Sequence, residues 1–322
     1  MAMLRTTALI FIALFAFVSV ASAQLTPAPT MTGQINDSAR EDLYNRFAEN
    51  KKVPVAERQR LAYEAARDYV KRFNQEGDPH FVEMRKFVTE YERVLHNYEL
   101  HELYTAKKYP KVFESGRATL KKDADNFYVL ATLTQAGYDL AQGGDATLNE
   151  ETVGYARRAI TIADSGKLSQ PAPFATLDDA RGFLNFALGW FLRAQSPVEA
   201  AEALTKAAKS ASRYKDDPLT YNLLGIAILK GEYAHAAAEY NTNFGNKPPS
   251  PEQEAAWGKL TKIGERVIDA YARAIALSTR PEQAEGKAKM LDHLTSLYKS
   301  FHNNSDAGLN DIIATVLSKH LP

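Results

Sequence analysis

The chain has 322 residues, no cysteine, and 39 basic against 39 acidic residues, so its formal net charge is zero. Without cysteine it cannot form disulfides, zinc–thiolate sites or a thiol nucleophile. Its balanced charge provides no global field that would attract nucleic acid or an anionic membrane, and we expect neither as a partner.

Residues 1–23 have the features of a secretory signal peptide. Arg5 precedes an apolar run over residues 8–18, and Ala21-Ser22-Ala23 follows as a cleavage site of the A-x-A type. We therefore expect cleavage after Ala23 and export to the periplasm or the cell exterior. The apolar run is shorter than the ~18 residues needed to span a bilayer. An uncleaved anchor is the alternative, and we expect no membrane span in the mature chain.

The next segments predict a flexible tether and then helices. Residues 24–37 are rich in threonine and proline, a composition typical of a tether. From Ser38, which begins a capping-box pattern, apolar residues recur with helical period, and Pro79 marks the start of a later helix. We expect residues 38–92 to form a set of N-terminal helices.

Helical hairpins with a recurring pattern are predicted over residues 93–244. The best preserved unit runs from Pro218 to Tyr240, with small residues wherever its two helices must approach each other. We expect these helices to meet in a tight turn at Lys230–Gly231, because glycine adopts unusual backbone angles at little cost. A hairpin of this size cannot bury its apolar face alone, so it must stack on neighbours of the same kind.

Seven residues of this unit fall at the aromatic, Leu-Gly, turn-glycine and small positions of a known repeat. They are Tyr221, Leu224, Gly225, Gly231, Tyr233, Ala236 and Tyr240. The unit therefore resembles a tetratricopeptide repeat (TPR), a two-helix motif of about 34 residues. The resemblance implies an all-α, right-handed superhelical array of helical hairpins, an α-solenoid. We expect residues 245–322 to complete the array as a degenerate repeat followed by C-terminal capping helices.

Arrays of this family bind peptides or helices on a concave face lined by the first helix of each hairpin, so the resemblance implies a partner-binding surface. Within it, residues 182–192 are apolar nearly all round. Such a helix either forms a groove with aromatic anchors, or is core covered by the segments 165–176 or 245–256. The implied surface residues are Tyr128, Gln135, Tyr138 and Asp139 from the second hairpin, Phe183, Phe186, Trp190 and Arg193 from the third, and Asn222 and Ile226 from the fourth.

No catalytic or metal-binding motif accompanies these residues. His96 and His101 are spaced so that they lie on different faces of a helix, and no HExxH, nucleophile-elbow or phosphate-loop pattern is present. We therefore expect no cofactor and a non-enzymatic function, the docking of a protein or peptide ligand.

Two alternatives remain open. The array could be a structural part of an envelope assembly that self-associates through its end helices, as a homo-oligomer. It could also be an enzyme whose site is built from the loops 143–150, 165–176 and 245–256. That reading requires side chains such as Asp139, Asp145 or His235 to converge in a closed pocket.

Overall fold

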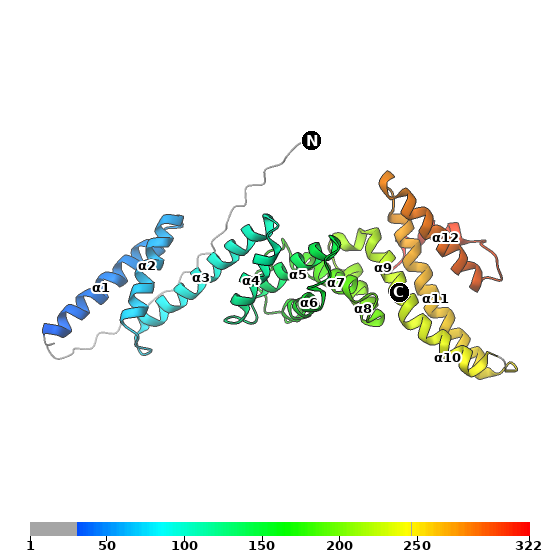
Figure 1. The fold of residues 1–322 in the computed structure, drawn as a ribbon, viewed down its shortest axis with the longest axis horizontal. Coiled ribbons are helices and arrows are strands. Elements are labelled where there is room, and N and C mark those ends of the chain that lie inside the picture. Colours follow the sequence, from blue (N-terminus) through cyan, green and yellow to red (C-terminus); the bar gives the residue numbers. More distant parts are fainter. Residues whose placement is uncertain (1–30, 246) are drawn as a thin grey trace. The chain divides into compact units, whose positions relative to one another are not determined.

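The computed structural model describes residues 31–245 and 247–322, so the predicted signal peptide and the first half of the predicted tether lie outside the described residues. Within these ranges all regular structure is helical, and consecutive helices pack on each other. The described chain is thus an all-α array of helical hairpins, as predicted. No helix in these ranges is long and apolar enough to cross a membrane. The first of two compact units ends at His96 and the second begins at Asn97 (Figure 1).

The first unit contains α1 (Met31–Lys51), α2 (Ala56–Arg72) and the first part of α3 (Pro79–Thr105). Helices α1 and α2 pack along each other. This unit has its own small core, which explains why it forms a separate cluster. The buried side chains are Leu43, Phe47, Ala62, Ala65, Ala66, Tyr69, Phe81 and Met84.

Helix α1 begins earlier than predicted. Residues 31–37, predicted as part of the tether, belong to the helix, and Ser38 lies inside it instead of at its start. Pro27 and Pro29 are the last prolines before Pro54. Proline breaks a helix interior, and residues 31–51 contain none, so no proline interrupts α1 in this range.

The second unit continues with helices that each pack against the next. Local signals set several of their starts. The side chain of Asn126 accepts a hydrogen bond from the N–H of Val129, and that of Thr176 accepts one from the N–H of Asp179. The helices are α4 (Tyr109–Leu120), α5 (Phe127–Gln142), α6 (Asn149–Asp164), α7 (Leu177–Leu192) and α8 (Pro197–Lys209).

Glycines lie where paired helices come closest. A Cβ atom at Gly137 of α5 would be 2.1 Å from Oγ1 of Thr152 in α6. One at Gly189 of α7 would be 2.4 Å from Cγ of Leu204 in α8. Both distances are far below van der Waals contact, so any larger residue would force the two helices or their side chains apart.

The predicted turn at Lys230–Gly231 is wrong. Helix α9 (Pro218–Ile228) continues through η2, a π-helical stretch (Leu229–Tyr233), directly into α10 (Ala234–Phe244). The backbone stays helical throughout, with φ −60° and ψ −45° at Leu229 and φ −60° and ψ −39° at Ala234. The three segments therefore form one continuous helix with a π-bulge in its middle.

Gly231 has a different role from the one predicted. A Cβ atom there would lie 3.1 Å from the backbone nitrogen of Val198, at the start of α8. The missing side chain allows the backbones of η2 and α8 to approach closely. The glycine is thus required by a contact between two helices and not by a reversal of the chain.

The fourth hairpin is consequently longer than predicted. Its first arm is the continuous helix α9–η2–α10, and its second arm is α11 (Pro251–Leu277), which packs along α9 and α10. The chain reverses in the proline-rich segment between the arms. The closing elements are η3 (Pro281–Gln283), α12 (Ala284–Phe301), α13 (Leu309–Thr315) and η4 (Val316–Ser318).

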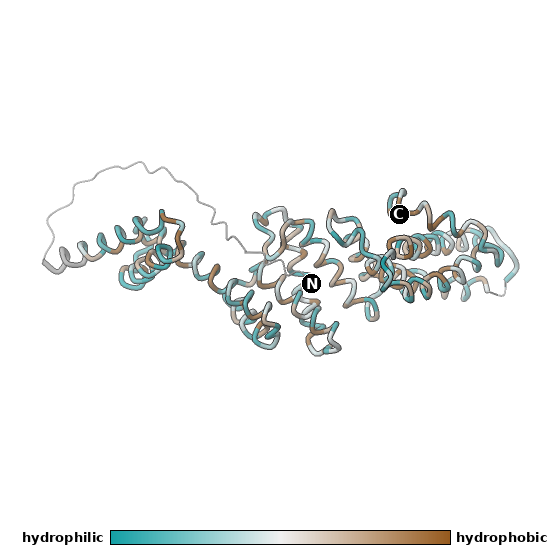
Figure 2. The backbone as a smooth tube through the Cα atoms, turned by 90° about the horizontal axis from the view of Figure 1, so that it is seen from above, coloured by the Kyte–Doolittle hydropathy of each residue, from teal (hydrophilic) through white to brown (hydrophobic). Residues whose placement is uncertain are grey.

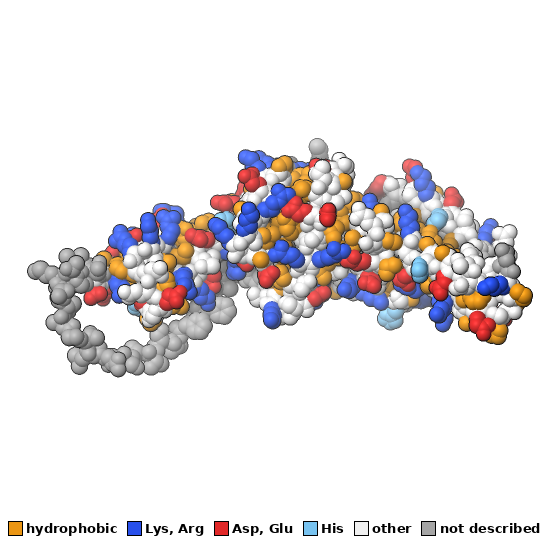
Figure 3. All heavy atoms as spheres, turned by 60° about the horizontal axis from the view of Figure 1, so that its bottom comes forward, with side chains coloured by type: hydrophobic (Ala, Val, Ile, Leu, Met, Phe, Trp, Pro, Cys, Tyr) orange, Lys and Arg blue, Asp and Glu red, His pale blue; other side chains and the backbone are white. Residues whose placement is uncertain are grey.

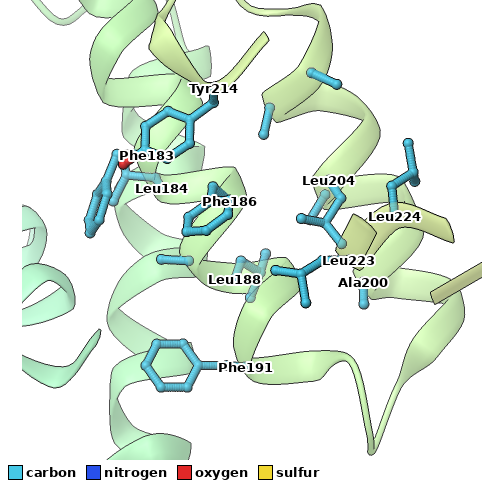
Figure 4. Packing of buried hydrophobic residues seen from close by; sticks show 14 of the residues in the cluster. Phe183, Leu184, Phe186, Leu188, Phe191, Ala200, Leu204, Tyr214, Leu223 and Leu224 are labelled. Atoms are coloured by element: carbon cyan, nitrogen blue, oxygen red, sulfur yellow. The ribbon is translucent and has the colours of Figure 1, made fainter. Parts of the chain in front are cut away.

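One hydrophobic core runs through the second unit from α3 to η4. Apolar residues recur along each of its helices, with polar residues between them (Figure 2). In Figure 4, Leu188 of α7, Leu204 of α8 and Leu223 of α9 point into one space. Each hairpin thus completes its burial by contact with its neighbour, as stacked repeats require.

Candidate partner-binding surface

The structure brings together some of the predicted surface residues. Tyr138 of α5 makes edge-to-face contacts with three rings of α7, at centroid distances of 6.0 Å to Phe183, 5.7 Å to Phe186 and 5.4 Å to Trp190. A fourth ring, Phe191, lies 6.5 Å away in the same geometry. Edge-to-face pairs are favourable beyond the area that they bury. Tyr138 is therefore held at the centre of an aromatic cluster.

Phe183 and Phe186 belong to the core. Their side chains are only 7% and 2% exposed, so they offer no surface to a partner. Phe174, from the predicted linker 165–176, lies 5.6 Å from Phe183, and Tyr214 stacks on Phe186 at 4.8 Å. Phe183 is therefore core covered by the segment 165–176, as one alternative predicted, whereas Phe186 is covered by Tyr214, which lies in neither predicted covering segment.

Trp190 and Arg193 lie at the end of α7 and are both half-buried. The guanidinium carbon of Arg193 lies 4.0 Å from the centre of the Trp190 ring, a cation–π contact. Arg193 also donates a hydrogen bond from Nη1 to the carbonyl of Trp190. Burial lowers the pKa of Arg193. The Arg193 guanidinium is thus held against the Trp190 ring, and both side chains are partly shielded from water.

Asp139 is held by two tyrosines that the prediction missed. Its Oδ2 accepts hydrogen bonds from the hydroxyls of Tyr104, at 2.9 Å, and Tyr109, at 3.3 Å. Burial and the Asp139 carboxylate raise the pKa of both phenols. The carboxylate is therefore engaged inside the protein. The one sequence signal for this contact is the position of Tyr104 and Tyr109 on either side of the turn between α3 and α4.

Polar residues that border this cluster also form hydrogen bonds with its tyrosines. Gln142 donates a hydrogen bond to the Tyr138 hydroxyl at 2.6 Å, and burial raises the pKa of Tyr138 to about 12. Arg213, in the short helix η1 (Arg213–Asp216), donates to the hydroxyl of the buried Tyr214 at 2.8 Å. Because Tyr138 stays protonated at neutral pH, the cluster keeps its hydroxyl as a neutral hydrogen-bonding group.

The remaining predicted residues lie outside this cluster. Tyr128 and Gln135 are half-buried on α5, and Asn222 and Ile226 are half-buried on α9. Tyr128 and Ile226 pack against the hydrophobic core. Their role in partner binding stays a prediction. We use the name Tyr138–Trp190 surface for the set Tyr138, Trp190 and Arg193.

Two clefts lie apart from this surface. One, of about 580 Å³ in the first unit, is lined by residues that include Arg40, Tyr44 and Asp78. The other, of about 670 Å³ in the second unit, is lined by residues that include Arg181 and Arg266. All three arginines form ion pairs with carboxylates of the protein, so their charges are already neutralised. On the face drawn in Figure 3, hydrophobic side chains gather over the middle helices, between basic and acidic ones.

The side chains named for the enzymatic alternative are engaged separately. Asp139 binds two tyrosines, Asp145 accepts a hydrogen bond from the Thr147 hydroxyl at 2.6 Å, and His235 is exposed on α10. Within residues 31–245 and 247–322 no group of three or more histidine or acidic side chains is arranged to hold a metal ion.

Comparison of the chain with protein-family models, with curated proteins and with solved structures found no match. The function is therefore inferred from the residues and their arrangement.

Proposed function

We propose that the chain is an exported, non-enzymatic scaffold of the tetratricopeptide type that binds a segment of a partner protein on the Tyr138–Trp190 surface. Ion pairs between successive hairpins support the repeat interpretation. Arg117 of α4 pairs with Glu151 of α6, and Arg157 of α6 pairs with Glu199 of α8, so each pair joins the second helices of two successive hairpins. Equivalent contacts between successive hairpins are what a stacked array of repeats produces.

The half-buried Trp190 is the observation that carries the proposal. It lies at the surface edge of an aromatic cluster whose other rings are packed, so its position is already determined before a partner arrives. Tryptophan and arginine are enriched among the residues that dominate binding energy at protein interfaces. A preorganised anchor also loses little side-chain entropy on binding.

Cross-linking and mass spectrometry on the exported protein in its native cells tests this proposal. We expect cross-links from the neighbourhood of Trp190 to a partner, and their loss in Trp190→Ala. Tyr98→Ala is the control because Tyr98 is an aromatic residue of α3 that is 54% exposed. If both variants remain helical by circular dichroism and keep the same cross-links, the surface is not the binding site.

Export is tested separately, by determining the N-terminus of the mature protein. The proposal expects Gln24 as the first residue, following cleavage after Ala23. A mature chain that still begins with the apolar run would favour the uncleaved anchor.

Self-association is the second candidate, and the tip of the α10–α11 hairpin favours it. Helix α10 contains no buried residue, and Trp257 is 43% exposed beside Tyr240. An exposed helix with a large aromatic neighbour is a suitable contact for another copy. Light scattering at two protein concentrations tests it, and an unchanged monomer mass at both would exclude this role.

A further inference from the structure

The arginines of the described chain follow a rule that has one exception. Exposed arginines occur with and without partners, but those that are buried or half-buried contact a carboxylate, with Arg193 excepted. This is expected, because removing a charge from water is costly unless an opposite charge replaces the lost hydration. The pairs are Arg40–Asp78 at 2.8 Å, Arg181–Asp164 at 2.9 Å, Arg266–Glu232 at 2.5 Å and Arg273–Asp269 at 2.7 Å.

No Asp or Glu oxygen of the described residues lies within 4.0 Å of the Arg193 nitrogens. The undescribed residues 1–30 and 246 include neither Asp nor Glu, so they hold no missing acidic side chain. The contacts that Arg193 makes are the Trp190 ring and the Trp190 carbonyl. These leave most of the five N–H donors of the guanidinium without a protein acceptor.

The carboxylates nearest to this cluster are already engaged. Asp139 accepts from two tyrosine hydroxyls, and Asp217 accepts from the N–H of Leu219 at the start of α9. Asp179 accepts from the Thr176 hydroxyl at the start of α7. Each of them is held by contacts within the protein, and none has an oxygen within 4.0 Å of the Arg193 nitrogens.

A second guanidinium group, that of Arg213, borders the same cluster. It lies 5.0 Å from the centre of the Tyr214 ring and donates to the Tyr214 hydroxyl, again without a carboxylate within 4.0 Å. Tyr214 in turn stacks on Phe186, beside Tyr138. The cluster thus presents two arginines that are fixed by aromatic rings and lack acidic partners.

We infer that the partner segment supplies the missing charge: an Asp or Glu side chain that pairs with Arg193, next to an apolar side chain that packs on Trp190. This rests on the proposed function and specifies the chemistry of the segment it binds. Arginine binds carboxylates through two parallel hydrogen bonds, and stacking on Trp190 holds the guanidinium plane ready for that geometry. Partial burial strengthens the pair relative to one in open water.

The experiment uses the full mature chain and a random linear peptide library displayed with both peptide ends blocked. Peptides that bind are synthesised with amidated ends, and their affinity is measured by fluorescence anisotropy. They are compared on the wild type, Arg193→Met, Arg193→Lys and Trp190→Ala. Arg46→Met, at an exposed arginine of α1 without an acidic partner, is the control. Circular dichroism confirms that each variant is folded.

We expect the selected peptides to share an Asp or Glu beside an apolar residue. Affinity should fall about tenfold or more with Arg193→Met, and replacing the acidic residue by its amide should cost the same. Combining the two changes should cost little more than either alone, because both remove one contact. Arg193→Lys should lose less than Arg193→Met, and Arg46→Met should lose nothing.

Three other outcomes distinguish a failure of the acidic pairing from a failure of the proposed function. Peptides that need Trp190 but bind Arg193→Met as tightly as the wild type overturn the acidic pairing and leave the proposed function standing. Selected peptides without an acidic residue do the same. A library that yields no peptide sensitive to Trp190→Ala overturns the proposed function as well.

Discussion

Arg273 is expected to hold the C-terminal segment against α11. Its side chain is 6% exposed and pairs with Asp269, whose side chain is 18% exposed, through an Nε–Oδ1 hydrogen bond of 2.7 Å. Its Nη2 donates to the carbonyls of Lys319 and His320 at 2.9 and 3.0 Å. Arg273→Met would leave a largely buried carboxylate unpaired and two carbonyls without their donor.

The magnitude follows from these contacts. Breaking a buried ion pair by removing one partner costs about 3–5 kcal/mol. The partial exposure of Asp269 places the pair itself near the lower end, and the two carbonyls add about 1 kcal/mol each. We therefore expect Arg273→Met to lower the unfolding free energy of the second unit by about 3–5 kcal/mol. At about 2–4 °C for each kcal/mol in a unit of this size, Tm falls by about 6–20 °C.

Denaturant unfolding followed by circular dichroism measures the loss, and hydrogen exchange locates it. Arg280→Met, which removes an exposed pair with Glu282, is the control and should leave the transition unchanged. The double variant Arg273→Met with Asp269→Leu should recover part of the loss, because it no longer buries a lone charge. A loss below about 1 kcal/mol for Arg273→Met, or no increase in amide exchange after Leu309, would refute the reasoning.

Two further predictions concern the helix contacts and the aromatic cluster. Gly189→Ala should destabilise the second unit by about 1–3 kcal/mol, because its Cβ would clash with Leu204. Gly154→Ala, whose Cβ would have nothing within 4 Å, should stabilise α6 by about 0.5–1 kcal/mol. Equal effects of the two variants in denaturant unfolding would contradict the packing of α7 on α8. The pKa of Tyr138 is raised from 10.0 to about 12, so the folded chain keeps a proton that the unfolded chain releases, and the unfolding free energy falls between pH 10 and about 12. Tyr138→Phe should make that fall shallower while exposed Tyr98→Phe leaves it unchanged, and identical pH profiles for the two variants would count against burial of Tyr138.

Helix positions were predictable wherever a local signal sets them. Pro79 opens a helix as expected, since proline suits the first turn, where its missing N–H costs nothing. The start of α1 was wrong because composition alone suggested the tether. Residues 31–37 lie beyond the last proline of that segment, and in the structure they are helical.

The candidate site was predictable in part. Helical spacing indicated that Trp190 and Arg193 share a face of α7, and they are in contact. Tyr138 was named only through the resemblance, and its packing against Trp190 comes from the structure. The burial of Phe183 was not predictable, because a helix that is apolar on every side does not show which face its neighbours cover. Tyr214, which covers Phe186, comes from a short helix that no repeat pattern includes.

By itself, the sequence determined that the described chain is helical and that its helices form stacked hairpins, and it located the start of a helix such as α3. Those properties depend on apolar periodicity and on caps, which act within a few residues. Only the tertiary structure decided the meaning of Gly231, which serves a contact with Val198 instead of a turn. It also decided which aromatic rings stay at the surface and which arginine lacks a carboxylate. These depend on residues distant in sequence, whose approach no local pattern records.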